Sequence, residues 1–206
     1  MTTTPVRKGE LTRQAILESA ATMASRIGLE GLTIGVLADE LELSKSGLFA
    51  HFKSKEALQL QVLEFGIGRF VDRVVKPALA APRGEKRVRA LFEHWLEWPK
   101  SSGLAGCMFV ALSTELDDQP GPVRERLVQS QKDWLDVLAN AVRTGVAEGD
   151  FQRDVDAEQF AHELYGIMLA GHHAVRLLRA RGAVERTRRA FARLLDSARV
   201  QGKAKG

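Results

Sequence analysis

Cysteine and proline are both scarce in this chain of 206 residues. The single cysteine, Cys107, excludes an internal disulfide and any metal site built from several cysteines. Six prolines are few for a turn-rich sheet protein, and no stretch alternates apolar and polar residues for long. The sequence therefore predicts an all-α protein.

Long apolar runs and enzyme motifs are missing as well. No segment approaches the ~18 apolar residues that a membrane span requires, and the opening MTTTPVRKGE contains no apolar signal region. We expect a cytoplasmic protein with no membrane partner. There is no G-x-S-x-G, no phosphate-binding glycine loop and no Cys/His or paired-carboxylate arrangement that stands out. We therefore expect no enzyme, no catalytic residue and no cofactor.

The charge is unevenly distributed along the chain. The net charge of +4 suggests nucleic-acid binding, but residues 1–60 hold seven basic and seven acidic side chains, so this segment is neutral. Residues 173–206 instead hold ten basic and two acidic side chains. A DNA-binding site in the first sixty residues must therefore be argued from its pattern and not from its charge.

Three helical patterns follow one another at the start of the chain. Apolar residues at helical spacing predict a helix over 10–27 that ends at Gly28. The side-chain oxygens of Thr33 and Ser44 are suited to cap the next two helices. The second of these helices has one apolar stripe, formed by Ile34, Leu37, Ala38 and Leu41.

The third helix has the spacing of the second half of a helix-turn-helix. Leu48 and Phe52, four residues apart, are expected to face inward, and Ala38 is small where the two helices must approach each other. The turn between them prefers glycine or asparagine at a left-handed position. Here that position holds Glu42, at a cost of roughly 1 kcal/mol.

The stretch from Thr33 to Leu58 reads T-I-x-x-L-A-x-x-L-x-L-S-K-S-G-L-F-x-H-F-K-S-K-E-x-L. It resembles the TetR (tetracycline-repressor) family of bacterial transcriptional regulators. The resemblance implies a three-helix helix-turn-helix DNA-binding domain over residues 1–56, followed by a larger helical ligand-binding and dimerisation domain over 57–206, with about nine helices in total. Two residues depart from the family pattern: Glu42 replaces the usual turn glycine, and Phe49 replaces a tyrosine whose hydroxyl typically touches a phosphate.

The expected partner of the third helix is a double-stranded DNA operator. Lys45 and Ser46, at its N-terminal end, are placed to reach base edges or nearby phosphates, and Gly47 permits close approach of the backbone. Four others are better placed for the phosphate backbone, namely Thr33, His51, Lys53 and Lys55. The predicted DNA-binding residues are Thr33, Ser44, Lys45, Ser46, Gly47, Phe49, His51, Lys53 and Lys55.

The rest of the chain reads as further helices. Prolines are expected to end the first two of them, at Pro77 and Pro99. The predicted ranges are 54–75, a helix around Trp95, 107–116, 123–147, 157–181 and 184–200.

The last two helices are expected to make a homodimer, because in the resembled family they pair with their copies across a two-fold axis. Gly166, Ala170 and Ala174 lie four apart, and such small residues let another helix come close. Packing of the same helices within one chain remains the alternative.

The resemblance also implies a small effector in the larger domain. Its candidate lining is apolar with few polar groups, so we expect an uncharged or lipophilic molecule. The predicted lining residues are Trp95, Trp98, Cys107, Met108, Phe109, Trp134, Tyr165, Met168 and His172. No metal is expected, since His172 and His173 point about 100° apart on a helix and do not readily share one ion.

Two functions remain open. The preferred one is a DNA-binding transcriptional regulator, namely a ligand-released dimeric repressor that binds a palindromic operator. The alternative is a helical small-molecule-binding module with a decayed DNA-reading head. Glu42, Phe49 and the neutral charge of the first sixty residues favour the alternative.

Overall fold

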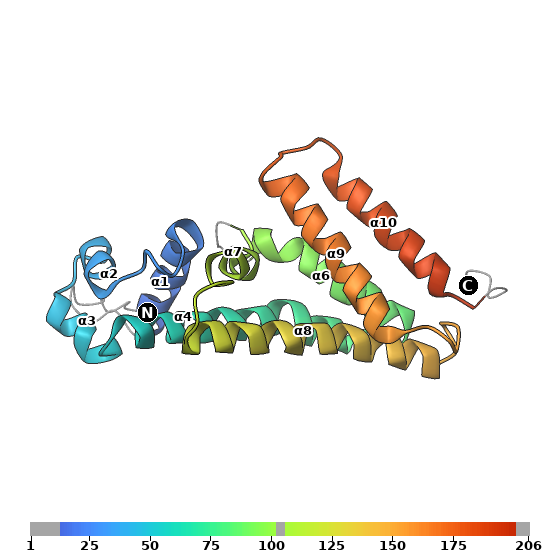
Figure 1. Ribbon diagram of the computed structural model, residues 1–206, viewed down its shortest axis with the longest axis horizontal. Helices are drawn as coiled ribbons and strands as arrows, with labels where there is room; N and C mark the ends of the chain where they lie inside the picture. Colours follow the sequence, from blue (N-terminus) through green and yellow to red (C-terminus); the bar gives the residue numbers. More distant parts are fainter. Residues whose placement is uncertain (1–12, 102–105, 201–206) are drawn as a thin grey trace, which may run out of the picture. The chain divides into compact units, whose positions relative to one another are not determined.

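The computed structural model describes residues 13–101 and 106–200, which form helices joined by turns (Figure 1). These residues contain no strand, only an isolated antiparallel bridge between Phe151 and Arg199. The all-α prediction is confirmed. None of the described helices is long and apolar enough to cross a bilayer. In chain order the helices are α1 (Arg13–Ile27), α2 (Ile34–Glu40), α3 (Lys45–Phe52), α4 (Lys55–Phe70), the π-helix η1 (Val71–Val75), α5 (Lys76–Ala80), α6 (Glu85–Ser101), α7 (Met108–Glu115), α8 (Pro122–Ala147), α9 (Ala157–Arg176) and α10 (Ala183–Ala198).

Residues 55–80 form one continuous helical rod, in which the π-helical turn η1 joins α4 to α5. The amide N–H of Lys76 donates to the carbonyl of Val71, five residues back. Because this shifts the hydrogen-bond ladder, Pro77 falls in the first turn of α5, where its missing N–H costs little. The prediction that Pro77 ends the helix is wrong. With this rod counted once, the described residues form nine helices, as expected.

Two other helix ends differ from the prediction. Pro99 does not stop α6, because it lies in the last turn and the helix runs on to Ser101. Helix α9 ends at Arg176, five residues before the expected Arg181, and Arg179 then turns the chain with a φ of 48°. The ends of α6 and α9 thus depend on the backbone geometry of individual residues, which the spacing of apolar residues does not indicate.

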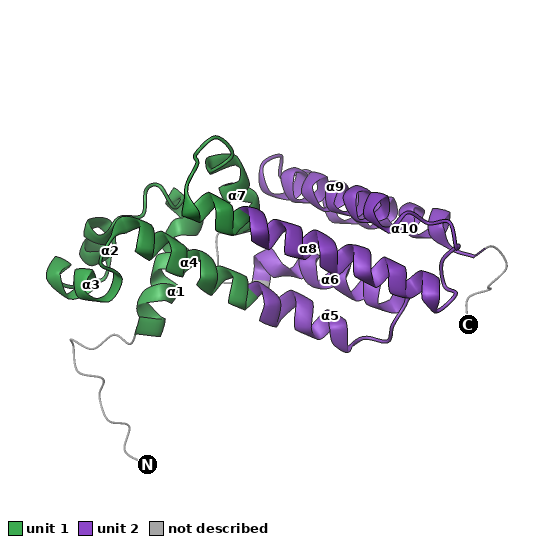
Figure 2. Cartoon of the chain, turned by 60° about the horizontal axis from the view of Figure 1, so that its bottom comes forward, with its two compact units in different colours: residues 1–69, 103–127 green, residues 70–102, 128–206 purple. Residues whose placement is uncertain are grey.

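The chain divides into two compact units (Figure 2). Unit 1 comprises residues 1–69 and 103–127, and unit 2 comprises residues 70–102 and 128–206. The chain therefore passes from one unit to the other three times, after residues 69, 102 and 127. The functional boundary expected after residue 56 is a different division and stays a prediction.

The core of unit 1 begins with the apolar face of α1. Residues at helical spacing on this face are buried, and side chains of α2 and α3 are buried in the same unit. The buried residues of these three helices are Ile16, Leu17, Ala20, Ala21, Ala24, Leu37, Ala38, Leu48 and Phe52.

In unit 2, α9 packs closely against α10. A Cβ atom on Gly171 would lie 2.6 Å from Oγ1 of Thr187, so a larger side chain at this position requires α10 to shift. Phe92 of α6 stacks on Phe191 of α10 with ring centroids 3.9 Å apart. The apolar face of α9 is therefore used within the chain, which was the alternative left open for it.

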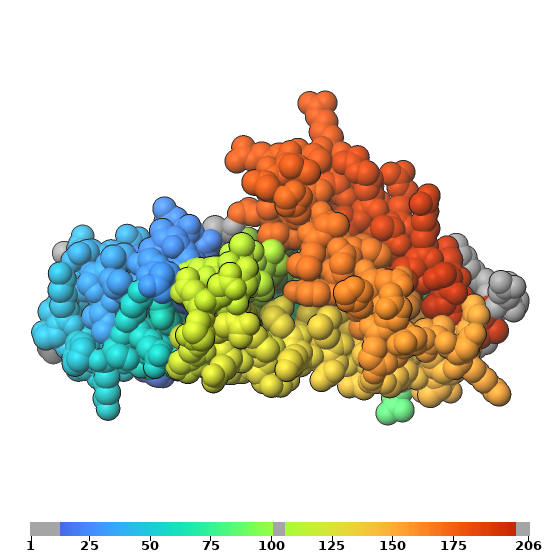
Figure 3. Space-filling model, viewed as in Figure 1, coloured from blue at the N-terminus to red at the C-terminus, as the bar shows by residue number. Residues whose placement is uncertain are grey.

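A second face of α9 stays uncovered by the described residues. Ala170 is exposed, and a Cβ on Gly166 would meet no other atom within 4 Å. The α9–α10 corner projects from unit 2 in the space-filling view (Figure 3), and it exposes Leu177 and Leu178. The row of small residues and this apolar corner thus lie open.

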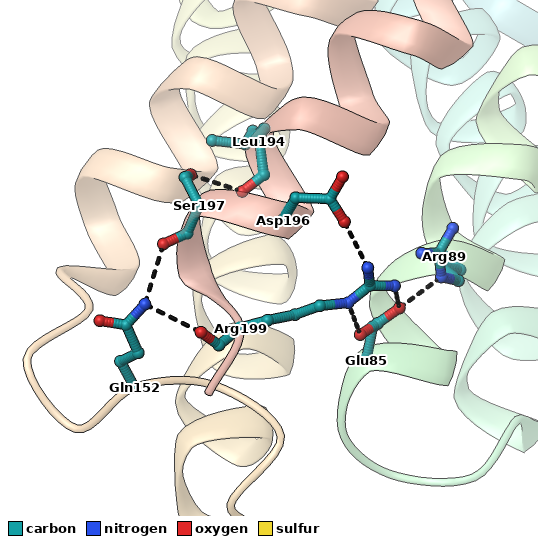
Figure 4. A network of polar contacts seen from close by, with 7 residues as sticks. All are labelled: Glu85, Arg89, Gln152, Leu194, Asp196, Ser197 and Arg199. Carbon is teal, nitrogen blue, oxygen red and sulfur yellow. Dashed lines mark hydrogen bonds and ion pairs between the residues drawn. The ribbon is translucent and has the colours of Figure 1, made fainter. Parts of the chain in front are cut away.

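A polar network fastens the end of α10 to the start of α6 (Figure 4). The Glu85 carboxylate accepts two hydrogen bonds from Arg199, with N···O distances of 2.6 and 2.7 Å, and one from Arg89 at 2.6 Å. Arg199 also pairs with Asp196, and its carbonyl accepts from the side-chain amide of Gln152 at 2.8 Å. The hydrogen bond from Arg199 holds the pKa of Glu85 below its ordinary value, although burial acts in the opposite direction.

Replacing Glu85 tests this network. For Glu85→Gln we expect the free energy of unfolding near pH 7 to fall by about 1 kcal/mol, a modest loss because Arg199 and Arg89 are partly exposed to water. Since folding lowers the pKa of Glu85, its contribution is present above its ordinary pKa of 4.5 and disappears as the pH falls through the lowered value. Urea denaturation at a series of pH values should show wild type and variant converging in acid.

The matched control is Glu97→Gln, which also removes one carboxylate from α6. Glu97 pairs with Lys100 at the surface, so its loss should change the stability little at any pH. Equal destabilisation by the two substitutions would contradict the role given to Glu85.

Candidate functional site

Side-chain caps define the starts of α2 and α3. Oγ1 of Thr33 accepts a hydrogen bond from the amide of Val36 at 3.1 Å. Oγ of Ser44 accepts one from the amide of Gly47 at 3.1 Å. Both capping residues have extended backbone angles, as an N-cap requires. The two predicted caps are confirmed.

The turn between α2 and α3 has the predicted left-handed residue. Glu42 has a φ of 52°, and the next amide, that of Leu43, donates to the carbonyl of Ala38 at 3.0 Å. Ala38, Leu48 and Phe52 each have only 1% of their surface exposed. The buried side chains therefore hold the turn in a conformation that Glu42 alone would disfavour.

The face of α3 opposite Leu48 and Phe52 is open to water. It includes an aromatic ring, since Phe49 has 56% of its surface exposed, which is high for a phenylalanine. The exposed residues of α3 are Lys45, Ser46, Gly47, Phe49, Ala50 and His51.

Lys45 lies beside the first turn of α2. A Cβ on Gly35 would lie 3.8 Å from Cε of Lys45 and 3.7 Å from Oγ1 of Thr33. The structure therefore brings Thr33 and Lys45 together, next to the cap formed by Ser44. The other predicted residues of α3 are exposed on the same helix as Lys45, so the predicted residues form one surface. They are Ser46, Gly47, Phe49 and His51.

The two lysines near the start of α4 have different surroundings. Lys53 is exposed and ends α3 with a φ of 62°, after which Oγ of Ser54 caps α4 by accepting from the amide of Ala57 at 3.0 Å. Lys55 instead forms an ion pair with Glu30 at 2.6 Å. The hydrogen bond from Lys55 is the main cause of the lowered pKa of Glu30. Of the nine predicted DNA-binding residues, Lys55 is thus the one whose charge is paired with another of the described residues.

An aromatic cluster lies in unit 2, directly before the π-helical turn. The ring of Phe70 contacts Trp98 and Trp134 edge-to-face, with centroid distances of 5.4 and 5.0 Å. Trp134 is buried, and its indole Nε1 has no hydrogen-bond partner among the described residues. A buried N–H without an acceptor costs free energy and is available to a ligand. Short π-helical segments such as η1 occur frequently at functional sites.

Polar groups of α8 and α9 belong to the same unit. The hydroxyl of Tyr165 donates to Oε1 of Gln131 at 2.7 Å. His172 is half-buried, and burial, followed by the nearby Arg176 and His173, lowers its pKa. The imidazole of His172 is therefore biased toward its neutral form.

The predicted lining residues divide between the two units. Six of them belong to unit 2, and all six lie within α6, α8 and α9. Cys107, Met108 and Phe109 belong to unit 1 and are buried there. Met108 packs on α4, since a Cβ on Gly66 would lie 2.3 Å from its sulfur. The residues of unit 2 are Trp95, Trp98, Trp134, Tyr165, Met168 and His172.

Sequence reasoning missed Phe70 and Gln131 as members of this group. Phe70 is one of several apolar residues of its helix, and Gln131 is one of several polar residues on α8. Neither carries a pattern that separates it from its neighbours, because contacts between distant helices single them out. Among the described residues, no group of three or more His, Cys, Asp or Glu is arranged to hold a metal ion.

Comparison with known proteins adds independent information. The model of the bacterial regulatory proteins of the tetR family matches residues 16–62, and that of the tetracyclin repressor-like C-terminal domain matches residues 84–191. The second match alone covers more than half of the chain.

Individual proteins agree with the family models. The HTH-type transcriptional repressor KstR2 of Mycolicibacterium smegmatis is 28% identical over 148 residues, which cover 71% of this chain and 70% of that protein. The structure of a TetR transcriptional regulator from Chloroflexus aurantiacus has a TM-score of 0.78 and 25% identity, and the match covers 93% of this chain and 96% of that one. A regulator from Saccharomonospora viridis, solved in complex with choline, has a TM-score of 0.75 and 26% identity, with 89% and 94% covered. The chain belongs to the TetR family of bacterial DNA-binding transcriptional regulators.

Proposed function

We propose that the protein is a homodimeric repressor, which binds a palindromic operator through α3 and is released from it by a small, mainly apolar effector held in unit 2. The observation that carries the DNA-binding part is the open polar face of α3, held in place by the buried Leu48 and Phe52. The KstR2 relative is itself named a repressor, which supports this direction of regulation. A protein that binds the bacterial chromosome acts in the cytoplasm.

Each predicted DNA-binding residue has a proposed part in DNA binding. Lys45 and Ser46 reach base edges in the major groove, and Gly47 lets the backbone approach the duplex. The remaining residues bind phosphates, partly through the amide groups of capped helix N-termini. These phosphate-binding residues are Thr33, Ser44, His51, Lys53 and Lys55, and the ring of Phe49 packs beside them without the hydroxyl of the family tyrosine.

Lys55 requires an exchange of partners in this scheme. Its ammonium group is paired with Glu30, and both side chains are partly exposed. An exposed ion pair is weak, so a phosphate can compete for the lysine. The neutral charge of residues 1–60, which include the helix-turn-helix and are called the reading domain below, therefore does not oppose DNA binding. The acidic partner of at least one lysine, Glu30, can be replaced by a phosphate.

The effector site is proposed around the aromatic cluster of unit 2. Phe70, Trp98 and Trp134 offer apolar ring surface, and the unpaired N–H of Trp134 offers one hydrogen bond. The effector is therefore a mainly apolar molecule that carries a carbonyl or other acceptor oxygen. The Saccharomonospora viridis regulator holds a small molecule, choline, which supports effector binding by this architecture. The places of Cys107, Met108 and Phe109 in such a site stay predictions.

Dimerisation through α9 and α10 is proposed from their open surfaces. Gly166 and Ala170 form a low surface on which a helix of a second copy can pack closely, and Leu177 and Leu178 add apolar area. The formed caps and the buried seam between α2 and α3 favour this repressor over a ligand-binding module with a decayed reading head.

Replacing Lys45 tests the reading surface. The probe is the duplex that the wild-type protein selects from a random library. Lys45→Ala should weaken binding to this duplex about 10-fold and relax selection at the base that the lysine contacts. Titration of a labelled duplex at two salt concentrations measures both the affinity and the number of phosphate contacts.

Lys132→Ala is the matched control, because Lys132 is an exposed lysine on α8, outside the helix-turn-helix. The affinity of this variant should stay within about 2-fold of the wild type, since it removes the same charge from a helix that is not proposed to touch DNA. An unchanged affinity of Lys45→Ala would contradict the proposed placement of α3.

Replacing Trp134 tests the chemistry of the effector. Trp134→Phe keeps an aromatic ring and removes the N–H. A panel of ketones, esters and amides, with their hydrocarbon analogues, is assayed for release of the selected duplex. Acceptor-bearing compounds that release the wild-type protein should require about 10-fold higher concentrations for the variant, because one buried hydrogen bond is lost.

The hydrocarbon analogues serve as the control in this assay. They lack an acceptor, so they should act on the wild type and on Trp134→Phe at similar concentrations. If the acceptor-bearing compounds also act equally on both proteins, Trp134 does not donate to the effector.

A further inference from the structure

A carboxylate from α7 holds the turn between α1 and α2. Oε2 of Glu115 accepts a hydrogen bond from the amide of Leu29 at 3.1 Å, and Oε1 accepts one from the amide of Glu30 at 2.5 Å. Glu115 lies 86 and 85 residues further along the chain than these two amides. Glu115, although distant in sequence, therefore holds the backbone of the turn that leads into the helix-turn-helix.

The shape of the turn is built for a negatively charged group. Gly28 has a φ of 78°, and the two amides that follow it point to the same side, which forms a small anion-binding nest. A Cβ on Gly28 would lie 2.6 Å from Oε2 of Glu115. Glycine is thus required both for the left-handed backbone and for the close approach of the carboxylate. Hydrogen bonds to a charged acceptor are stronger than those between neutral groups.

The same turn is held from α4. The carbonyl of Leu29 accepts from Nε2 of the buried Gln59 at 2.6 Å, and the carboxylate of Glu30 pairs with Lys55 at 2.6 Å. Leu29 and Glu30 are therefore held by two helices. A carboxylate of α7 accepts from their amides, and side chains of α4 bind the carbonyl of Leu29 and the carboxylate of Glu30. All of these residues belong to unit 1 (Figure 2).

The position of the reading helix depends on this turn. Thr33, which caps α2, comes three residues after Glu30, and α2 in turn carries α3. The contacts that fix the backbone at Leu29 and Glu30 therefore also fix where α2 begins. In this way they set the position of the helix-turn-helix relative to α4 and α7. In a dimer, the placement of the two α3 helices must match the distance between the two half-sites.

We propose that Glu115 is a positioning residue for DNA binding, which holds the reading domain at the orientation that selects the half-site spacing of the operator. This role rests on the proposed function as a dimer on a palindromic operator. Glu115 touches no DNA. It acts through the α1–α2 turn, and its loss lets the helix-turn-helix move on α4.

The test measures spacing preference separately from affinity. The probes are the palindromic duplex that the wild-type protein selects from a random library, versions with one or two base pairs added to or removed from its centre, and a duplex with a single half-site. The full-length variants are Glu115→Gln, which keeps the size of the side chain, and Glu115→Ala. The control is Glu125→Gln, which removes an exposed carboxylate from the first turn of α8.

The wild type and Glu125→Gln should bind the selected spacing at least about 10-fold more tightly than the altered spacings, because two rigid heads fit one spacing. Both Glu115 variants should bind the selected duplex about 5- to 10-fold more weakly, with the preference among spacings reduced to about 3-fold or less. Their binding to the single half-site should stay within about 2-fold of the wild type, because α3 itself is unchanged.

Several results would overturn the proposal. One is an unaltered spacing preference in both Glu115 variants. A loss of affinity in equal proportion for all duplexes, the single half-site included, would mean that Glu115 only stabilises the fold, and so would the loss of the helical circular-dichroism signal in both variants. If the wild type selects no palindrome, the proposed function itself fails, and the role of Glu115 fails with it.

Discussion

The packing of α3 on α2 is the constraint on which the proposed function depends. Leu48 and Phe52 are almost fully buried, and Ala38 is small enough to admit them. This burial holds Glu42 in a left-handed conformation that its side chain disfavours. Burying one large apolar side chain contributes about 1.5–3 kcal/mol, which exceeds the roughly 1 kcal/mol cost of the strained residue. The polar face of α3 is presented to solvent because its opposite face is held this firmly.

The reading domain is also stabilised by hydrogen bonds from side chains of α4 and α7, which lie outside its three helices α1 to α3. Its own helices α1 to α3 supply a core of small and medium apolar residues, but two amides of the α1–α2 turn have their acceptor outside these helices. Glu115 of α7 accepts from two of its amides, and Gln59 of α4 donates to its carbonyl. Unit 1 therefore combines the start of the chain with a segment around α7, and the unit is larger than the helix-turn-helix alone.

Unit 2 uses its aromatic and charged residues in different ways. The ring of Phe70 lies between two tryptophans at the point where α4 passes into the π-helical turn, so that a backbone irregularity and the unpaired N–H of Trp134 occur in one region. The charged network of Glu85 and Arg199 closes the far end of α10 instead. The aromatic region has an unsatisfied polar group and the charged region is well satisfied, which is why the former is the better candidate for a ligand.

The amino-acid sequence by itself determined the helical class, the caps at Thr33 and Ser44, the inward positions of Leu48 and Phe52, and the left-handed turn at Glu42. All of these depend on residues within a few positions of one another, where periodicity and backbone preference act directly. Only the tertiary structure decided that Pro77 continues a helix, that Lys55 pairs with Glu30, that Phe70 joins two tryptophans and that Glu115 holds the α1–α2 turn. The Glu115 and Phe70 contacts join residues far apart in the chain, and the helix at Pro77 depends on a shifted hydrogen-bond ladder. Neither a distant contact nor a shifted ladder leaves a local pattern in the sequence.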